Sequence, residues 1–127
     1  MLKMTSGPAR NALPFKYTST AHSDIEGILR YTAGRFGALQ RRRYAELIDA
    51  AANLVGEQPE RAGSRPRDEL GAGIRSFHLE LATGRRGAAA HVLYYISGRL
   101  DDGSEGVIIL RVLHDRMDPA RHIIQDL

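Results

Sequence analysis

The sequence predicts an α+β domain with the order β-α-α-β-β-β and a short C-terminal helix, in which an antiparallel sheet packs on a helical hairpin. Two stretches with helical spacing of apolar residues adjoin at Gly37, which favours two antiparallel helices. Three strand-like stretches follow, separated by turn signals such as Asp102-Gly103. Such a hairpin must bury its apolar stripe against one face of the sheet, giving a two-layer architecture.

The first 14 residues are small, polar and interrupted by proline, so we expect a flexible extension before a single domain over residues 15–127. They lack the apolar core of a signal peptide, and no apolar run approaches the roughly 20 residues that cross a bilayer. The absence of cysteine fits a reducing compartment. We therefore expect a cytoplasmic protein without a membrane partner.

The alternation of Phe15 and Tyr17 with polar residues predicts a short first strand. A helix is expected to begin at Thr20 or Ser23, with Ser23 and Glu26 forming a capping box, and to end at Gly34–Gly37. Its apolar face comprises Ile25, Ile28, Leu29, Thr32 and Phe36. The second helix, over residues 38–55, has a buried stripe of Tyr44, Leu47, Ile48, Ala51 and Val55.

A charged surface loop is expected over residues 57–72, followed by strands over Ile74–Leu81 and Ala89–Ile96. The last strand begins near Val107 and is apolar almost throughout, which predicts burial on both faces. Asp118 followed by Pro119 is typical of an N-cap and first helical residue.

The five histidines lack the spacing of metal-ligand pairs and there are no cysteines, so we expect neither a metal site nor a cofactor. His114 with Arg111 and Arg116 suggests acid–base chemistry on a phosphodiester, with arginine holding the anion. The alternative is that His114 only closes a strand and bonds locally. Spacing alone does not choose between them.

Taken in order, a set of short motifs resembles the ParE branch of the RelE/ParE toxin superfamily over roughly residues 15–124. The strongest of these motifs is the C-terminal one, RVLHDRMD, which runs from Arg111 to Asp118. The others are Asp24-Ile25 with Ile28 and Tyr31, Phe36-Gly37, Tyr44 with Leu47, Arg67-Asp68-Glu69-Leu70, Gly73 to Phe77, and His91 with Tyr94-Tyr95. The sequence TGRRGAAA between Leu81 and His91 makes the second hairpin longer than the family pattern.

The resemblance implies the toxin of a type II toxin–antitoxin system, a non-enzymatic inhibitor of DNA gyrase that forms a hetero-oligomer with a ParD-like antitoxin. It implies target-binding residues in and near the closing motif: Arg75, Arg111, His114, Arg116 and Asp118. The alternative is a RelE-like ribosome-dependent endonuclease that cleaves mRNA. In that alternative, His114 would act as the acid or base, and Arg75 and Arg111 would bind the phosphate. The scarcity of lysine favours the ParE branch.

Antitoxins of this family fold a disordered segment over the toxin. We expect it to bind the helical hairpin and a sheet edge, with Tyr31, Phe36 and Leu39 as apolar anchors. Acidic antitoxin residues would meet the arginines of the hairpin, namely Arg30, Arg35, Arg41 and Arg42. The alternative for the aromatic residues is ordinary packing in the core.

Overall fold

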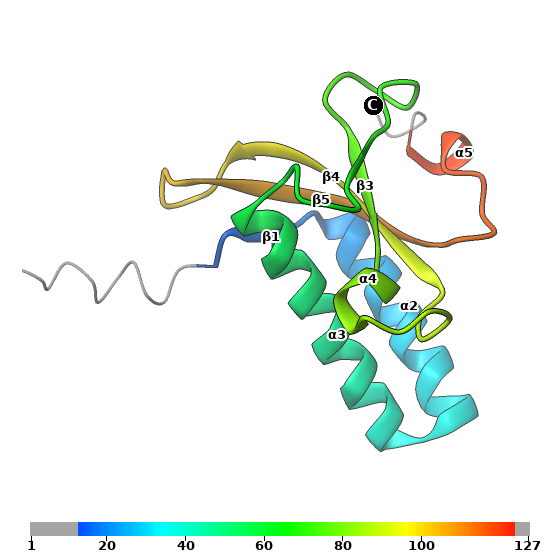
Figure 1. Cartoon of the computed structure of the whole chain (residues 1–127). Helices are drawn as coiled ribbons and strands as arrows, with labels where there is room; N and C mark the ends of the chain where they lie inside the picture. Colours follow the sequence, from blue (N-terminus) through cyan, green and yellow to red (C-terminus); the bar gives the residue numbers. More distant parts are fainter. Residues whose placement is uncertain (1–12, 124–127) are drawn as a thin grey trace, which may run out of the picture.

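The computed structural model describes residues 13–123 and shows a five-stranded sheet with a helical hairpin on one face (Figure 1). The α+β class, the helical hairpin and the short C-terminal helix are confirmed. The elements in order are β1 (Phe15–Tyr17), α2 (Ser19–Phe36), α3 (Ala38–Glu57), β2 (Arg65–Pro66), β3 (Arg75–His78), α4 (Glu80–Thr83), β4 (His91–Arg99), β5 (Glu105–His114) and α5 (Ala120–Ile123). Of the predicted extension, residues 1–12 lie outside the described part.

The strand order is β1-β5-β4-β3-β2, and the last three long strands form the predicted antiparallel meander. β1 joins the sheet parallel to β5, so the sheet is mixed rather than antiparallel throughout. Val107 N–H donates to the Pro14 carbonyl and Thr18 N–H to the Ile109 carbonyl, which fixes β1 at the edge. The short strand β2 lies within the stretch predicted to be a loop.

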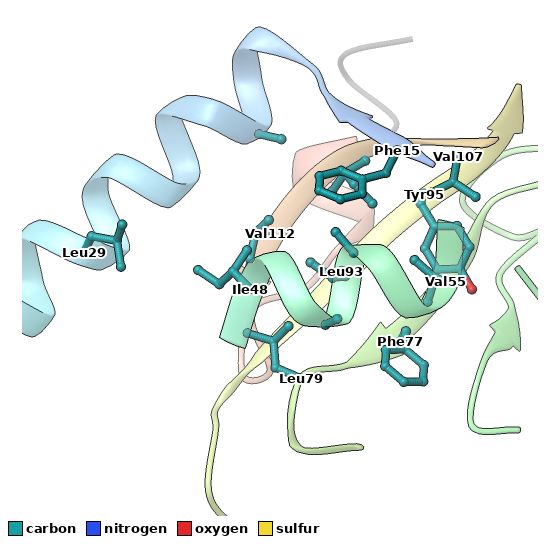
Figure 2. Packing of buried hydrophobic residues seen from close by; sticks show 14 residues of the cluster. Phe15, Leu29, Ile48, Val55, Phe77, Leu79, Leu93, Tyr95, Val107 and Val112 are labelled. Atoms are coloured by element: carbon teal, nitrogen blue, oxygen red, sulfur yellow. The ribbon is translucent and has the colours of Figure 1, made fainter. Parts of the chain in front are cut away.

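The main core lies between the helical hairpin and the sheet (Figure 2). Its largest fully buried side chains include Ile48 of α3, Phe77 of β3 and Tyr95 of β4. A second cluster on the opposite sheet face contains Leu113 and is covered by Ile123 of α5. β5 therefore contributes to both clusters, which confirms the burial predicted from its apolar run. In residues 13–123, no helix has the length and apolar character needed to cross a membrane.

The first helix starts earlier than expected, because Thr18 rather than Thr20 or Ser23 is its N-cap. The Thr18 hydroxyl accepts from Ala21 N–H at 3.0 Å and donates to the Leu110 carbonyl at 3.0 Å, so one side chain caps α2 and joins it to β5. Phe36, predicted to lie on the buried face, is 62% exposed because the hairpin tip extends beyond the sheet (Figure 1).

The strand predicted over residues 74–81 ends at His78, and α4 begins at Glu80. Leu79 has helical backbone angles, and the ring of His78 accepts the N–H of Glu80 at 3.1 Å. This local bond competes with continuation of the strand. The turn brings Leu79 into the core but leaves Leu81 47% exposed, so the predicted alternation fails at Leu81.

Gly106 allows β1 to approach β5, since a Cβ at this position would overlap the Pro14 carbonyl. We expect Gly106→Ala to lower the free energy of unfolding by about 2 kcal/mol through overpacking. Gly34→Ala is the matched control, because nothing lies within 4 Å of a Cβ there, and it should raise stability by about 0.5–1 kcal/mol through helix propensity. Urea unfolding measures both, and equal effects would contradict this account of β1.

Candidate functional site

Two of the predicted site residues, Arg111 and His114, lie where β5 ends, beside α2. Arg111 Nε donates to Asp24 Oδ2 at 2.8 Å, and Arg111 Nη2 donates to Asp24 Oδ1 at 2.9 Å. The N–H of Val112 donates to the same carboxylate at 3.0 Å. The side chains of Arg111 and Asp24 are only 15% and 13% exposed. This bidentate pair therefore fixes α2 against β5 at the edge where β1 has already ended.

A β-bulge produces this arrangement. Arg111 lies opposite Tyr94, but Ile109 lies opposite Tyr95, so Leu110 is an extra residue in β5. Leu110 packs on the second apolar cluster. The extra residue shifts the alternation by one position, so that Val112 lies on the helical face and Leu113 on the other. It also explains why a charged residue interrupts the apolar run.

Arg111 also anchors the C-terminal helix, since its Nη1 donates to the His122 carbonyl at 2.9 Å. Between these points, residues 115–118 form an exposed turn. Asp118 Oδ1 accepts from Ala120 N–H at 3.1 Å, which fits the predicted N-cap role. Arg116 is exposed in the same turn. The segment Asp115–Ile123 is thus held at both ends while its polar turn faces solvent.

The structure does not bring all the predicted residues together. Arg75 Nε donates to Ser64 Oγ at 2.7 Å, in the loop before β2. β4 separates its strand from β5, and Arg75 lines a different hollow from the one that contains Arg111 and His114. The trio His114, Arg75 and Arg111 is therefore not assembled around one site.

Side chains that the predicted set omits surround His114. His91 lies directly opposite it in the sheet, with ring centroids 5.3 Å apart. The Tyr44 hydroxyl of α3 lies 2.7 Å from His91 Nδ1, and His78 Nε2 lies 3.0 Å from Asp115 Oδ2. The pairing of a helical tyrosine with a strand histidine depends on tertiary packing, and the local sequence contains no signal for it.

The hydrogen bonds identify the accepting nitrogen in two of these rings. His78 Nδ1 accepts Glu80 N–H and His114 Nδ1 accepts Arg116 N–H, so their ring protons lie on Nε2. Ala90 N–H donates to the Tyr44 hydroxyl, which also forms a hydrogen bond with His91 Nδ1. Burial raises the pKa of Tyr44, so this hydroxyl keeps its proton.

Electrostatics favour a neutral ring at His91. Burial, followed by repulsion from His114, lowers the pKa of His91 to about 4. The hydrogen bond from His78 lowers the pKa of Asp115, so the carboxylate stays ionised. In the described part of the chain, no set of three or more His, Cys, Asp or Glu side chains is arranged to bind a metal ion.

A groove of about 530 Å³ runs between α2 and the end of β5, and we call it the α2–β5 groove. Its α2 side includes Asp24, Gly27, Ile28 and Tyr31, and its other side includes Arg111, Leu113, His114, Met117 and His122. Tyr31 is 63% exposed and Met117 47% exposed, so large apolar surfaces face solvent on both sides.

The Asp24–Arg111 pair predicts a large cost for removing one partner. Asp24→Ala takes away the carboxylate bound by Arg111 and Val112, and should lower the free energy of unfolding by about 3 kcal/mol. The control is Asp101→Ala, since the pair with Lys16 is exposed and contributes at most about 1 kcal/mol. Urea denaturation compares the two variants, and similar losses would contradict the anchoring role.

The neutral His91 predicts acid sensitivity. Because its pKa is about 4 when folded and near 6.5 when unfolded, the unfolded chain binds more protons between these values. Stability is fully present above pH 6.5 and declines as the pH falls toward 4. At pH 5.5 the loss should reach up to about 1 kcal/mol, allowing for partial exposure of the ring.

Thermal unfolding at pH 7.5 and 5.5 measures this loss. His91→Gln should show a smaller difference between the two pH values than the unsubstituted chain. His22→Gln, at an exposed position, should retain the full difference. Identical pH dependence in both variants would exclude His91 as the cause.

Comparison with known proteins places this chain in a family. The family model described as the ParE toxin of the type II toxin–antitoxin system parDE matches residues 15–119. Toxin ParE1 of Caulobacter vibrioides is 28% identical over 110 residues, covering 87% of this chain and 97% of that protein. Toxin ParE of Escherichia coli is 32% identical over 103 residues, covering 80% of this chain and 84% of that protein. The match extends from β1 to the turn after β5, and the chain belongs to the ParE family of toxins of type II toxin–antitoxin systems.

Proposed function

We propose that this toxin inhibits DNA gyrase by stalling the cleaved-DNA intermediate, and that a ParD-like antitoxin neutralises it. Gyrase inhibition is the activity that the resemblance to the ParE branch implies. The observation that supports it best is the exposed turn at residues 115–118, which Arg111 and α5 hold in a fixed place. A rigidly presented polar turn suits recognition of another macromolecule.

Within the proposed target-binding set, the residues play different parts. Arg116 and Asp118 are exposed and His114 is partly exposed, so these side chains are available to gyrase. Arg111 is a positioning residue, because Asp24 and the His122 carbonyl already bind its guanidinium. Arg75 lies farther along the sheet beside Ser64 and would contact a second part of the target.

A second candidate function is ribosome-dependent cleavage of mRNA. The adjacent rings of His91 and His114, with Tyr44 bonded to His91, favour it as a pair of acid–base groups. The position of Arg75 outside this cluster weighs against it, since the reaction needs cations on the phosphate. We therefore retain it as the alternative to gyrase inhibition.

The antitoxin surface is proposed on the helical hairpin. Tyr31, Phe36 and Leu39 are 63%, 62% and 53% exposed, so core packing does not account for them. The arginines proposed to meet acidic antitoxin residues, Arg30, Arg35, Arg41 and Arg42, are also exposed. Apolar anchors surrounded by cations suit an amphipathic acidic segment that folds on binding.

Purified toxin with gyrase, plasmid and ATP tests the target. We expect the unsubstituted toxin to trap linear DNA, and Arg116→Glu to reduce trapping at least tenfold by reversing a charge in the exposed turn. Arg86→Glu is the matched control, since Arg86 is exposed in the turn after α4, and should leave trapping unchanged.

Failure of excess toxin to trap DNA, in a preparation that still arrests growth, would reject gyrase as the target. Loss of growth arrest in His114→Ala together with cleaved messages in the unsubstituted strain would then support the ribosome. Loss of trapping in both arginine variants would reject the turn at residues 115–118 as the contact.

A further inference from the structure

The turn after α4 carries two adjacent arginines within the insertion that lengthens the second hairpin. The backbone of this turn is held by side chains, since the Thr83 hydroxyl accepts Arg85 N–H at 2.9 Å. At its far end, Glu80 Oε1 accepts Gly87 N–H at 2.8 Å. The turn therefore presents the exposed side chain of Arg85 from a fixed backbone.

This turn and α3 border a hollow of about 470 Å³, which we call the α3–α4 hollow. α4 packs against α3 (Figure 1), so Arg85 of the turn and Arg43 of the helix line the same hollow. Within residues 13–123, neither guanidinium forms an ion pair or a hydrogen bond with another side chain. Two such groups around one hollow favour an anion, and their planar forks match phosphate oxygens.

The α3–α4 hollow lies at the same end of the sheet as the exposed turn at residues 115–118. β4 begins and β5 ends at this end, where the two strands are paired. Asp115 N–H donates to the Ala90 carbonyl at 2.8 Å. Tyr44, which lines the hollow, accepts Ala90 N–H through its hydroxyl. A macromolecular assembly that binds the turn at residues 115–118 can therefore reach the hollow as well.

We propose that the α3–α4 hollow binds a backbone phosphate of the duplex DNA that the target holds, with Arg43 and Arg85 donating to the phosphate oxygens. This inference rests on the proposed function, in which the toxin stalls a cleaved-DNA intermediate. The toxin then contacts both components of the stalled complex, the enzyme through residues 115–118 and the DNA through the hollow. A phosphate contact adds affinity without sequence preference.

The first measurement is the affinity of the full toxin chain, without gyrase, for a short fluorescent DNA duplex over a range of salt concentrations. Loss of one phosphate contact reduces the magnitude of the slope of log affinity against log salt by about 0.9. We expect this reduction in Arg43→Gln and in Arg85→Gln, with binding at least threefold weaker at low salt. Arg86→Gln is the matched control and should keep the full slope, because Arg86 is exposed in the same turn but does not line the hollow.

Three results would overturn the proposal. Equal losses of slope in all three variants would show a general effect of net charge, with no role for the hollow. Absence of duplex binding at low salt would show that the toxin does not contact DNA. Tighter binding of a single-stranded RNA of the same length would assign the hollow to a different class of partner. Circular dichroism and thermal unfolding establish that each variant is folded.

Glu46 provides a test that a folding defect cannot imitate. Its exposed carboxylate lines the α3–α4 hollow and repels a phosphate there, so we expect Glu46→Gln to strengthen duplex binding at least threefold. Glu57→Gln changes the net charge equally at an exposed position on α3. It lies about 16 Å farther along the helix, beyond the screening length of about 8 Å at physiological salt. Affinity should stay unchanged in Glu57→Gln, and equal gains in both variants would contradict binding at the hollow.

The gyrase assay separates this inference from the proposed function. If the unsubstituted toxin traps DNA, a chain with both Arg43→Gln and Arg85→Gln should trap at least tenfold less, and full trapping by this variant would refute the DNA contact. If the unsubstituted toxin does not trap DNA, the target is wrong. The salt slopes of the toxin alone then still decide whether the hollow binds DNA phosphate.

Discussion

The arrangement of this toxin depends on the ion pair between Asp24 and Arg111. One carboxylate of α2 receives two guanidinium N–H groups and a backbone N–H from β5, while the same guanidinium reaches the carbonyl of His122 in α5. The pair is mostly shielded from solvent, so its hydrogen bonds are stronger than those of an exposed pair. It fixes the separation of the two sides of the α2–β5 groove and the position of the turn that follows β5.

Much of the fold could be predicted from the sequence because local patterns determine it. The hairpin of α2 and α3, the Asp102-Gly103 turn and the doubly buried β5 follow from periodicity and turn chemistry. The N-cap could not be chosen from the sequence, since several hydroxyl residues precede the helix and only Thr18 also reaches the Leu110 carbonyl. The parallel position of β1 and the end of β3 at His78 depend on contacts between distant residues.

In the candidate site too, local sequence patterns predict some features, and contacts between distant residues determine the others. The closing motif identified Arg111, His114 and Asp118 as a cluster, and these residues do lie at the end of β5 and the turn beyond it. No local pattern pairs Asp24 with Arg111, because they are 87 positions apart. The contact of Tyr44 with His91 likewise requires α3 to lie beside the start of β4. The distant partners of the site residues, Asp24 and Tyr44, are therefore what sequence reasoning omitted.

The pairing of β1 with β5 has a consequence for synthesis of the toxin. Phe15 lies beside Val107, so β1 has no neighbour in the sheet until β5 has been made. Loop closure over such a distance makes this pairing slow compared with formation of the helical hairpin. The nascent chain thus contains the exposed hairpin well before it contains the groove or the polar turn. The proposed target-binding residues at the end of β5 therefore reach their folded arrangement only after β5 has been translated.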